Sequence, residues 1–367
     1  MWIETSKGPT RVRNLVGKAF VAAVGGELHA APNGFVQTGL RPVFRVNTSR
    51  GYSIRAATDQ KVLVETGRRL KSGGGYNYDH EWISVGELKA GNQMVLDASR
   101  FSVVEPDAKS FGRGWLLGEM VGDGGYNPGK YSGYVRFWNE HAEFMAMRAA
   151  EIIKTHLMPR SDFKGSNWSE ANGTITVSSS ELSYLAKHLI EPGTKAGTDL
   201  LETMRQDFLR GFLSGLFDSD GSVQGSTEKG VSIRLSQSDL CRLQMVQRML
   251  LRLGIASTIY CNRREAGDRM LPDGKGGERA YPTKANHELH VSKSALGVFR
   301  DVIGLHQPEK ESRLDQVLTG RKRALYTDRF TTKFVGVEAS GMEPVYDCMV
   351  EGVNCLVSNG LVVSNCG

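Results

Sequence analysis

The chain has 367 residues, of which 40% are hydrophobic and 23% are charged, and its formal net charge at pH 7 is +6. This composition is typical of a globular protein of two or three domains, and it contains no run of about 18 apolar residues that could span a membrane. The five cysteines include no Cys-x-x-Cys pair, which argues against a zinc site or a disulfide framework and predicts a cytoplasmic protein. The modest positive charge permits nucleic-acid binding without demonstrating it.

Residues 1–104 are predicted to form short strands separated by turns. The segment 20–24 leads into a Gly-Gly pair, and the alternating segments 43–48 and 52–55 flank a Ser-Arg-Gly turn, which is a hairpin pattern. Residues 319–367 have the same character, with expected strands at 334–337, 345–350 and 355–357. Both ends of the chain are therefore predicted to be rich in β-strands.

Residues 105–318 follow a different pattern, in which helical periodicity dominates, as in 143–153. The sequence therefore predicts an α/β domain inserted into a β domain that is formed by 1–104 and 319–367. The expected fold class is multidomain α+β.

The inserted segment contains an internal duplication. Its first half matches its second half in three places, in the same order: 115–124 with 212–221, 135–137 with 233–235, and 175–178 with 289–292. Three ordered matches indicate two repeats, at about 111–195 and 205–318, each built as helix, strands, helix, strands, helix.

Each repeat begins with a helix that carries two small residues on one face. Gly118 and Gly122 are four residues apart, as are Gly215 and Ser219, so each pair lies on a single side of its helix. Because small residues allow two backbones to approach closely, the two helices are predicted to meet at the centre of a pseudo-dimer.

Asp123 and Asp220 are predicted at the C-termini of these helices, each followed by a glycine suited to the left-handed conformation that ends many helices. A carboxylate is unfavourable there by about 0.3–1 kcal/mol, because a helix C-terminus already carries partial negative charge. A divalent cation would reverse the sign of this interaction, and Mg²⁺ combines a few carboxylates with water and phosphate. The alternative is that both aspartates simply face solvent, but their duplication at matched offsets favours metal-dependent phosphodiester cleavage.

The two motifs resemble those of the LAGLIDADG homing endonucleases, and the resemblance covers about 105–318. It implies that Asp123 and Asp220 bind catalytic Mg²⁺ ions and cut double-stranded DNA. It also implies that the strands after each helix form a saddle over the duplex, with Arg136 and Arg234 near it. A lysine or arginine in a late strand assists catalysis in some members, which makes Lys293 a candidate.

A basic segment in the second repeat has two interpretations. It includes Arg263 and Arg264 and continues through several further Lys and Arg residues interrupted by glycines. The segment is either a solvated loop or a set of contacts to DNA phosphates.

The last seven residues combine an apolar run with an Asn365-Cys366 pair. An asparagine can cleave its own backbone, because its side-chain amide can attack its own carbonyl carbon and close a succinimide. The thiol that follows can hold an acyl group as a thioester. Together with the segments Val-Tyr-Asp at 345–347 and Asn-Gly at 359–360, this ending resembles the C-terminal splicing blocks of inteins.

The intein resemblance implies that the two chain ends form one Hint domain, an all-β horseshoe. It identifies Asp347, Asn365 and Cys366 as retained catalytic residues. It also implies that Cys366-Gly367 begins the downstream host sequence, and a Cys-Gly there fits insertion before a catalytic Cys-Gly of the kind found in ribonucleotide reductases.

The sequence departs from the splicing pattern at five functional positions, one of which is Ala57, where the family has a threonine. The start, Met1-Trp2, lacks the Cys or Ser that the family places shortly before the tryptophan, and Gln60, Asn354 and Ser364 stand where the family has histidines. Because positioned proton donors typically contribute about 10²–10⁴-fold, splicing is predicted to be degenerate or disabled. Cleavage at Asn365 is the step that the retained residues still allow.

The combined prediction is an intein-encoded, site-specific DNA endonuclease that acts as a monomer on the intein-free allele of its host gene. Its other partners would be the flanking host protein segments, with no membrane association. One alternative is an endonuclease whose β segments serve only as a scaffold. A second is a non-catalytic DNA- or RNA-binding protein of the maturase kind, which the retention of both Asp123 and Asp220 disfavours.

Overall fold

The computed structural model describes most of the chain, and the residues that it describes are 1–98, 106–127, 132–157, 167–171, 173–191, 193–226, 230–272, 277–320 and 325–365. Cys366, one of the predicted catalytic residues, lies outside them. In the part of the chain that is described, no helix is long and apolar enough to cross a membrane.

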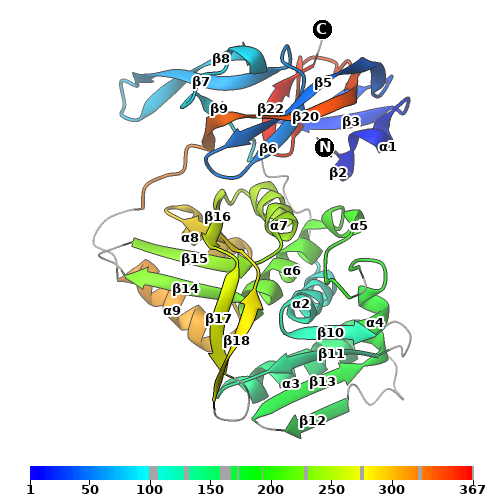
Figure 1. Cartoon of the computed structure of the whole chain (residues 1–367), viewed down its shortest axis with the longest axis vertical. Coiled ribbons are helices and arrows are strands. Elements are labelled where there is room, and N and C mark those ends of the chain that lie inside the picture. The colour runs from blue at the N-terminus through cyan, green and yellow to red at the C-terminus, as the bar shows by residue number, and fades with distance from the viewer. Residues whose placement is uncertain are drawn as a thin grey trace. The chain divides into compact units, whose positions relative to one another are not determined.

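The chain divides into two compact units (Figure 1). Unit 1 contains residues 1–102, 248–258 and 327–367, and unit 2 contains 103–247 and 259–326. Both ends of the chain therefore belong to one unit, and each unit is described by itself below.

Unit 1 is built almost entirely from strands, in a 12-stranded sheet with the order β4-β3-β1-β21-β22-β7-β9-β20-β5-β6, in which β2 also pairs with β1 and β8 with β7. Its elements are β1 (Trp2–Thr5), β2 (Gly8–Arg11), α1 (Val12–Leu15), β3 (Phe20–Val24), β4 (Glu27–Ala31), β5 (Val36–Thr48), β6 (Ser53–Ala56), β7 (Lys61–Leu70), β8 (Tyr76–Ser84), η1 (Val85–Glu87), β9 (Gln93–Val95), β20 (Thr331–Asp347), β21 (Cys355–Ser358) and β22 (Leu361–Ser364).

The two ends of the chain interleave within this sheet. Strand β20 pairs with β5 over nearly its whole length, and β22 lies between β21 and β7. Their inward side chains form one core, in which Val46, Val62, Val64, Met94 and Leu361 are completely buried. Because both ends contribute side chains to this core, they fold as one body.

Strand β20 differs from the sequence expectation. Two separate strands were expected at 334–337 and 345–350, whereas one strand runs from Thr331 to Asp347 and ends before Val350. Its 13-residue partner β5 provides a continuous pairing edge, and three irregularities in the register allow the two strands to stay paired while they bend.

Two ion pairs fix the segment that returns the chain to unit 1. Asp328, a buried carboxylate, accepts hydrogen bonds from Nη1 and Nη2 of Arg50 at 3.0 and 2.8 Å. The next residue, Arg329, pairs with the buried carboxylate of Glu65 in β7. Neighbouring residues of opposite charge thus bind the turn between β5 and β6 and the strand β7, which defines where β20 begins.

Unit 2 contains two similar four-stranded sheets and a separate hairpin. Its elements are α2 (Ala108–Asp123), β10 (Gly124–Asn127), β11 (Ser132–Phe137), α3 (Ala142–Ile152), the π-helical turn η2 (Ile153–Leu157), β12 (Asn167–Ala171), β13 (Thr174–Ser179), α4 (Ser180–Ala186), α5 (Asp199–Glu202), α6 (Gln206–Ser219), β14 (Gly221–Ser226), β15 (Gly230–Gln237), α7 (Leu240–Arg252), β16 (Ser257–Arg264), β17 (Gly267–Pro272), β18 (Glu278–Thr283), β19 (Asn286–Ser292), α8 (Ala295–Val302) and α9 (Pro308–Thr319). The end of α7, from residue 248, and the start of β16, to residue 258, are counted with unit 1.

The duplication seen in the sequence is also present in the strand pairing. The sheet orders β10-β11-β13-β12 and β14-β15-β19-β16 are equivalent. The register is equivalent too, because Val135 pairs with Val177 in the first sheet and Ile233 pairs with Val291 in the second. Residues matched in the two repeats therefore occupy matched places in three dimensions.

The first helices of the two repeats, α2 and α6, pack directly against each other (Figure 1). A Cβ atom added to Gly118 would lie 2.2 Å from the carbonyl oxygen of Phe212, and one added to Gly215 would lie 2.1 Å from that of Trp115. The predicted backbone-to-backbone contact is confirmed, and each helix depends on a glycine of its own to make it.

The glycines after the two helices play a different role from the predicted one. Gly124 has φ −128° and begins β10, and Gly221 begins β14, so neither adopts the left-handed conformation. A Cβ atom on Gly124 would lie 2.3 Å from the carbonyl oxygen of Tyr134, and one on Gly221 would lie 2.5 Å from that of Phe217. Both positions need glycine because the backbone turns sharply against its neighbours.

We expect Gly118→Ala to destabilise the protein by about 1–3 kcal/mol, because the added methyl group meets backbone that cannot rotate away. Thermal unfolding followed by circular dichroism would measure this loss. The matched control is Gly297→Ala in α8, where a Cβ atom would meet nothing within 4 Å. There the higher helix propensity of alanine should stabilise by up to about 1 kcal/mol. Equal effects of the two substitutions would contradict the close packing of α2 and α6.

Candidate metal centre and nucleic-acid interface

The two predicted metal ligands lie at the adjoining ends of α2 and α6. Asp123 is the last residue of α2, and Asp220 is the residue that caps α6. A Cβ atom added to Gly122 would lie 2.0 Å from Oγ of Ser219 and 3.4 Å from the carboxyl carbon of Asp220. The helix ends therefore touch, and each presents one half-buried aspartate.

The surroundings disfavour charge on both aspartates. Burial raises the pKa of Asp123, and the negative charge of Asp220 raises it further. Burial also raises the pKa of Asp220, although the hydrogen bond that Nε2 of Gln237 donates to Oδ2 at 2.7 Å acts in the opposite direction. Two carboxylates with raised pKa values at one place are typical of a site that binds a cation or transfers protons.

Two lysines that the sequence analysis missed lie beside the aspartates. Nζ of Lys195 donates to the carbonyl oxygen of Gly122 at 2.9 Å, and Nζ of Lys310 donates to that of Ser219 at 3.0 Å. Gly122 and Ser219 are equivalent in the two repeats, so each helix end receives one ammonium group at the same carbonyl. Burial lowers the pKa of both lysines, while the aspartates act to raise it.

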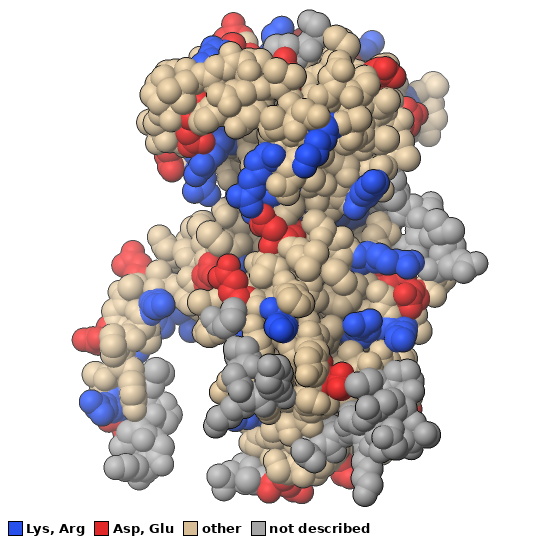
Figure 2. Space-filling model, turned by 90° about the vertical axis from the view of Figure 1, so that its right-hand side faces the viewer, with Lys and Arg blue, Asp and Glu red and all other residues tan. Residues whose placement is uncertain are grey.

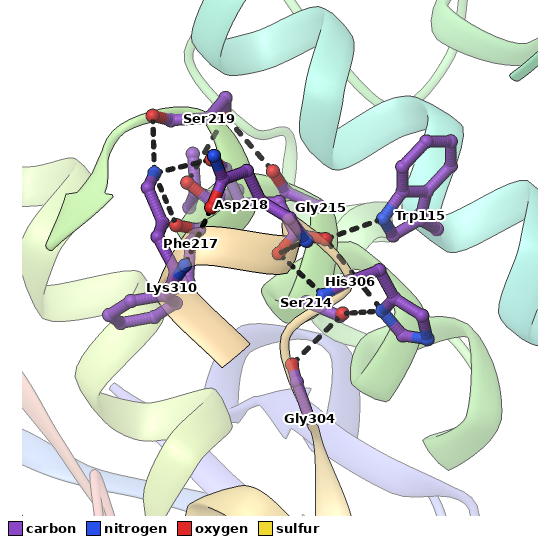
Figure 3. Close-up of polar contacts among 11 residues, drawn as sticks. Trp115, Ser214, Gly215, Phe217, Asp218, Ser219, Gly304, His306 and Lys310 are labelled. Atoms are coloured by element: carbon purple, nitrogen blue, oxygen red, sulfur yellow. Dashed lines mark hydrogen bonds and ion pairs between the residues drawn. The ribbon is translucent and has the colours of Figure 1, made fainter. Parts of the chain in front are cut away.

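Lys310 also donates to the carbonyl oxygens of Phe217, at 3.2 Å, and of Asp218. One ammonium group thus satisfies three carbonyls at the C-terminus of α6 (Figure 3). Its positive charge complements the helix dipole at the point where Asp220 opposes it. Sequence reasoning had no local signal for this contact, because Lys310 lies 91 residues beyond the carbonyl that it binds.

Asp218, two residues before Asp220, has a structural role (Figure 3). Its Oδ2 accepts from Nε1 of Trp115 in α2 at 2.8 Å, and its Oδ1 accepts from the backbone N–H groups of His306 and Gln307 at 2.8 and 3.0 Å. These three bonds satisfy a carboxylate that is only 4% exposed. Asp218 thereby joins α6 to α2 and to the turn before α9, which carries Lys310.

Gln237 connects the second aspartate to the first repeat. While its Nε2 holds Asp220, its Oε1 accepts from Nη1 of Arg242 at 3.1 Å. Nη2 of Arg242 donates to the carbonyl oxygen of Thr194 at 2.8 Å, next to Lys195. A chain of polar contacts thus fixes the position of Lys195 relative to Asp220.

Arg136 and Arg234 occupy equivalent places in β11 and β15. Each lies between two buried residues of its strand, so its side chain projects from the opposite face of the sheet. The guanidinium carbon of Arg136 lies 4.6 Å above the ring of Tyr134, and Nε of Arg234 donates to Oγ of Ser232 at 2.9 Å. Their predicted contact with DNA stays a prediction.

The other predicted nucleic-acid and catalytic residues of unit 2 lie apart from the aspartates. Arg263 and Arg264 end β16, and Nε of Arg263 is 3.7 Å from Oε2 of Glu288. Lys293 follows β19 as an exposed residue with φ +59°. The lysines that interact electrostatically with Asp123 are Lys195 and Lys310, which makes them stronger candidates than Lys293 for assisting catalysis.

Charge on the surface is mixed. On the face drawn in Figure 2, Lys and Arg side chains lie among Asp and Glu side chains and do not merge into one basic surface among the described residues. Any DNA contact on this face would therefore depend on individual side chains at defined places.

Asn365 lies in a buried site of unit 1 and is 7% exposed. Its Nδ2 donates to the carbonyl oxygen of Cys348 at 3.0 Å, and its backbone N–H donates to that of Asn354 at 3.2 Å. Its Oδ1 has no hydrogen-bond partner among the described residues. Asp347, another predicted residue, is connected to Asn365 through Cys348. Its Oδ1 accepts a hydrogen bond from the backbone N–H of Cys348 at 2.8 Å, and the carbonyl oxygen of Cys348 accepts the one from Asn365.

Gln60 and Ser364, which replace two expected histidines, contact each other. Nε2 of Gln60 donates to the carbonyl oxygen of Ser364 at 2.6 Å and lies 3.3 Å from its Oγ. Gln60 therefore binds the carbonyl that precedes Asn365. The structure thus brings Gln60, from the first part of the chain, to a group near the C-terminus that contains Asp347, Asn354, Ser364 and Asn365.

The donor set at the helix ends fits a Mg²⁺ site that is completed by its substrate. No three His, Cys, Asp or Glu side chains are placed to hold a metal ion among the described residues. Two carboxylates with raised pKa values are present, and Mg²⁺ is usually bound by one or two carboxylates together with water and phosphate oxygens. The remaining ligands would then come from solvent and a phosphodiester.

Comparison with known families gives one match, which falls on the second repeat. Residues 207–304 match the family described as LAGLIDADG-like domain. This segment begins in α6 and includes Asp220, and the first repeat has the equivalent strand order.

Relatives of the chain carry three different names. It is 25% identical over 342 residues to a ribonucleoside-diphosphate reductase subunit alpha of Bacillus subtilis, a match that covers 88% of this chain and 30% of the reductase. It is 26% identical to a DNA polymerase of Thermococcus hydrothermalis, over 68% of this chain and 15% of the polymerase. It is 23% identical to a replicative DNA helicase of a Nostoc species, over 96% of this chain and 47% of the helicase.

Solved structures of the homing endonuclease I-DmoI resemble part of the chain. One in complex with DNA and Ca is 16% identical, has a TM-score of 0.38, and covers 57% of this chain and all of I-DmoI. A WhiA protein from a Thermotoga species has a TM-score of 0.36 and covers 62% of this chain. Likeness at this level does not establish a shared function.

In metal-free protein, we expect Asp123→Asn to raise the melting temperature at pH 7, by an amount corresponding to about 0.3–1 kcal/mol. The raised pKa means that the folded state binds the proton more tightly than the unfolded state. Wild-type stability therefore falls as the pH rises from 3.8, the ordinary pKa of the group, through the raised pKa of the folded state. The gain should disappear below pH 3.8, the ordinary pKa of the group, where both states are protonated.

Melting curves in EDTA from pH 3 to pH 8 would measure this difference. Asp268→Asn, at an exposed position in β17, provides the control and should leave the curves unchanged. A destabilised Asp123→Asn protein at neutral pH would contradict the repulsion between the two helix ends.

Proposed function

We propose that the chain is an intein in which unit 2 is a site-specific DNA endonuclease and unit 1 is a Hint splicing domain. The observation that carries the endonuclease proposal is the meeting of Asp123 and Asp220 at the adjoining ends of two duplicated helices. The match of residues 207–304 to the LAGLIDADG-like domain supports it.

The names of the relatives support the idea of an inserted element. A reductase, a polymerase and a helicase catalyse unrelated reactions, yet each is similar to this one chain over a minor part of its own length. The shared sequence therefore has a function separate from those reactions. A gene for a ribonucleotide reductase is the host that we propose, because that match combines 25% identity with coverage of 88% of this chain, and because Cys366-Gly367 fits insertion before a catalytic Cys-Gly.

In this proposal Asp123 and Asp220 hold Mg²⁺ ions, one carboxylate from each repeat. Bound Mg²⁺ would neutralise charge on the phosphodiester and make a coordinated water more acidic. Lys195 and Lys310 hold the two helix ends in place and supply positive charge beside the aspartates. Because the two halves are equivalent, each can act on one strand of a duplex.

Gln237 keeps Asp220 oriented through its hydrogen bond to Oδ2. Arg136 and Arg234, at equivalent places on the outer faces of the two sheets, would bind phosphates on either side of the cleavage position. In this proposal the chain aligns the phosphodiester and supplies charge around it. Both contributions depend on the contact between α2 and α6.

We expect the protein to linearise a supercoiled plasmid that carries the uninterrupted host gene in the presence of Mg²⁺. Asp123→Asn and Asp220→Asn should each reduce cutting by at least about 10²-fold, because each removes a carboxylate that would hold the Mg²⁺ ion needed to stabilise the anionic transition state, while DNA binding in Ca²⁺ persists. Agarose gels and a mobility-shift assay would measure the two quantities.

Asp268→Asn should cut like the wild type. Undiminished cutting by either site variant would refute the metal assignment. A wild-type protein that binds this DNA and never cuts it would favour the non-catalytic binding protein instead.

A second proposed activity is cleavage of the bond between Asn365 and Cys366. Nδ2 of Asn365 would attack the carbonyl carbon of the same residue, forming a succinimide and releasing a fragment with a free amine on Cys366. In the structure Nδ2 is bound to the carbonyl oxygen of Cys348, so this bond must break first. Gln60 binds the carbonyl of Ser364, which holds the strand end and leaves the carbonyl of Asn365 to another donor.

We expect slow release, over hours at neutral pH, when a small reporter is fused after Gly367. Intact mass spectrometry should detect a fragment that begins at Cys366, and Asn365→Ala should abolish it. Gln60→Ala should slow release by loosening the end of β22. A fusion that stays intact would show that unit 1 is a scaffold without backbone chemistry.

A further inference from the structure

The hairpin formed by β7 and β8 extends beyond the sheet of unit 1 (Figure 1). Strand β7 pairs with β22 at Val62 and with β9 at Val64 and Glu65. Beyond Glu65, within the described part of the chain, β7 pairs with β8 alone, and this pairing continues to Leu70 and Tyr76. The outer half of the hairpin is therefore a two-stranded ribbon.

One face of this ribbon carries an aromatic ladder. Tyr76, Tyr78, His80 and Trp82 alternate along β8 with Asn77, Asp79 and Glu81. Alternate residues of a strand project from one face and follow each other at about 6.5 Å, and the ring centres of Tyr76 and Tyr78 are 6.4 Å apart. Tyr76 and Trp82 are 41% and 40% exposed, so the ladder is open to solvent.

Two arginines lie on this aromatic face. The guanidinium carbon of Arg68 is 4.6 Å above the ring of Tyr76, and that of Arg329 is 4.6 Å above the ring of Tyr78. Arg68 forms no ion pair with any described carboxylate, so its charge is available to a ligand. The opposite face is polar and internally neutralised, because Arg69 pairs with Asp79 there.

Cross-strand packing explains only in part why aromatic side chains occur along this strand. Arg68 lies opposite Tyr78, and Leu70 lies opposite Tyr76, and such pairs stabilise hairpins. However, Leu70 is 73% exposed, and an isolated ribbon gains little by leaving apolar rings in water. Arg329 is paired with Glu65, which leaves Arg68 as the guanidinium group of this face that can bind a phosphate. Flat rings at regular intervals beside such a guanidinium group are what proteins use to stack bases and bind phosphates along a single strand.

We propose that the aromatic face of the β7–β8 hairpin binds single-stranded nucleic acid. Bases stack on Tyr76, His80 and Trp82, and a phosphate contacts Arg68, while Arg329 stays paired with Glu65. The bases of a duplex are already stacked on each other and cannot reach these rings, so the site favours single strands. It is separate from the two aspartates of unit 2 and does not depend on the endonuclease proposal.

The test is fluorescence anisotropy of labelled 15-nucleotide dT and rU strands with the full chain in EDTA. Replacing both Tyr76 and Trp82 by Leu keeps apolar side chains for the cross-strand contacts but removes two flat rings. Because base stacking contributes several-fold to tenfold or more per ring, we expect this double variant to bind at least about tenfold more weakly. Tyr76→Ser with Trp82→Ser should weaken binding at least as much.

The matched control replaces both Arg69 and Asp79 by Ala, which removes a neutral pair from the opposite face of the same ribbon and should change affinity less than twofold. Arg68→Gln should reduce the salt dependence of binding. Single-strand affinity unchanged in the Leu double variant would overturn the proposal. So would an equal loss of affinity for a duplex of the same length. Mg²⁺-dependent cutting of plasmid by the same variants reports on the endonuclease independently.

Discussion

The close approach of α2 and α6 is the contact on which the rest of unit 2 depends. Gly118 and Gly215 let the helix backbones come within the distance that a methyl group would occupy, and this approach brings the two helix ends together. The aspartates are adjacent because the helices are, and the two sheets are related to each other through the same contact. A single packing constraint thus converts a duplicated sequence into one composite site.

The electrostatics of that site are a balance of opposed terms. Each aspartate lies where the helix dipole and the other carboxylate disfavour a negative charge, and burial adds to this effect. Lys195 and Lys310 offset part of it by binding equivalent carbonyls, and Asp218 holds the turn from which α9 and Lys310 follow. The lysines do not cancel the effect completely, because the pKa values of both aspartates stay raised. A divalent cation would supply the positive charge that the pair still lacks.

Unit 1 holds its polar groups in a different way. Around Asn365 the side-chain amide is engaged by a backbone carbonyl, and Gln60 occupies the carbonyl one residue earlier. The side-chain amide of Gln60 and the backbone carbonyl of Asn354 keep this end of the chain in place through hydrogen bonds to Ser364 and Asn365. These contacts fix the position of Asn365 without a histidine side chain.

The sequence by itself determined the features that depend on local spacing. The β-rich ends, the two repeats, the small faces of their first helices and the aspartates at the helix ends all follow from periodicity within short windows. Only the tertiary structure decided the partners. Lys195 and Lys310 bind carbonyls 73 and 91 residues away, and Trp115 binds Asp218 across 103 residues, so no local pattern marks them. The glycines after the two helices illustrate the same limit. Their need for glycine was visible in the sequence, but its cause is contact with neighbouring backbone, because steric crowding is set by the fold.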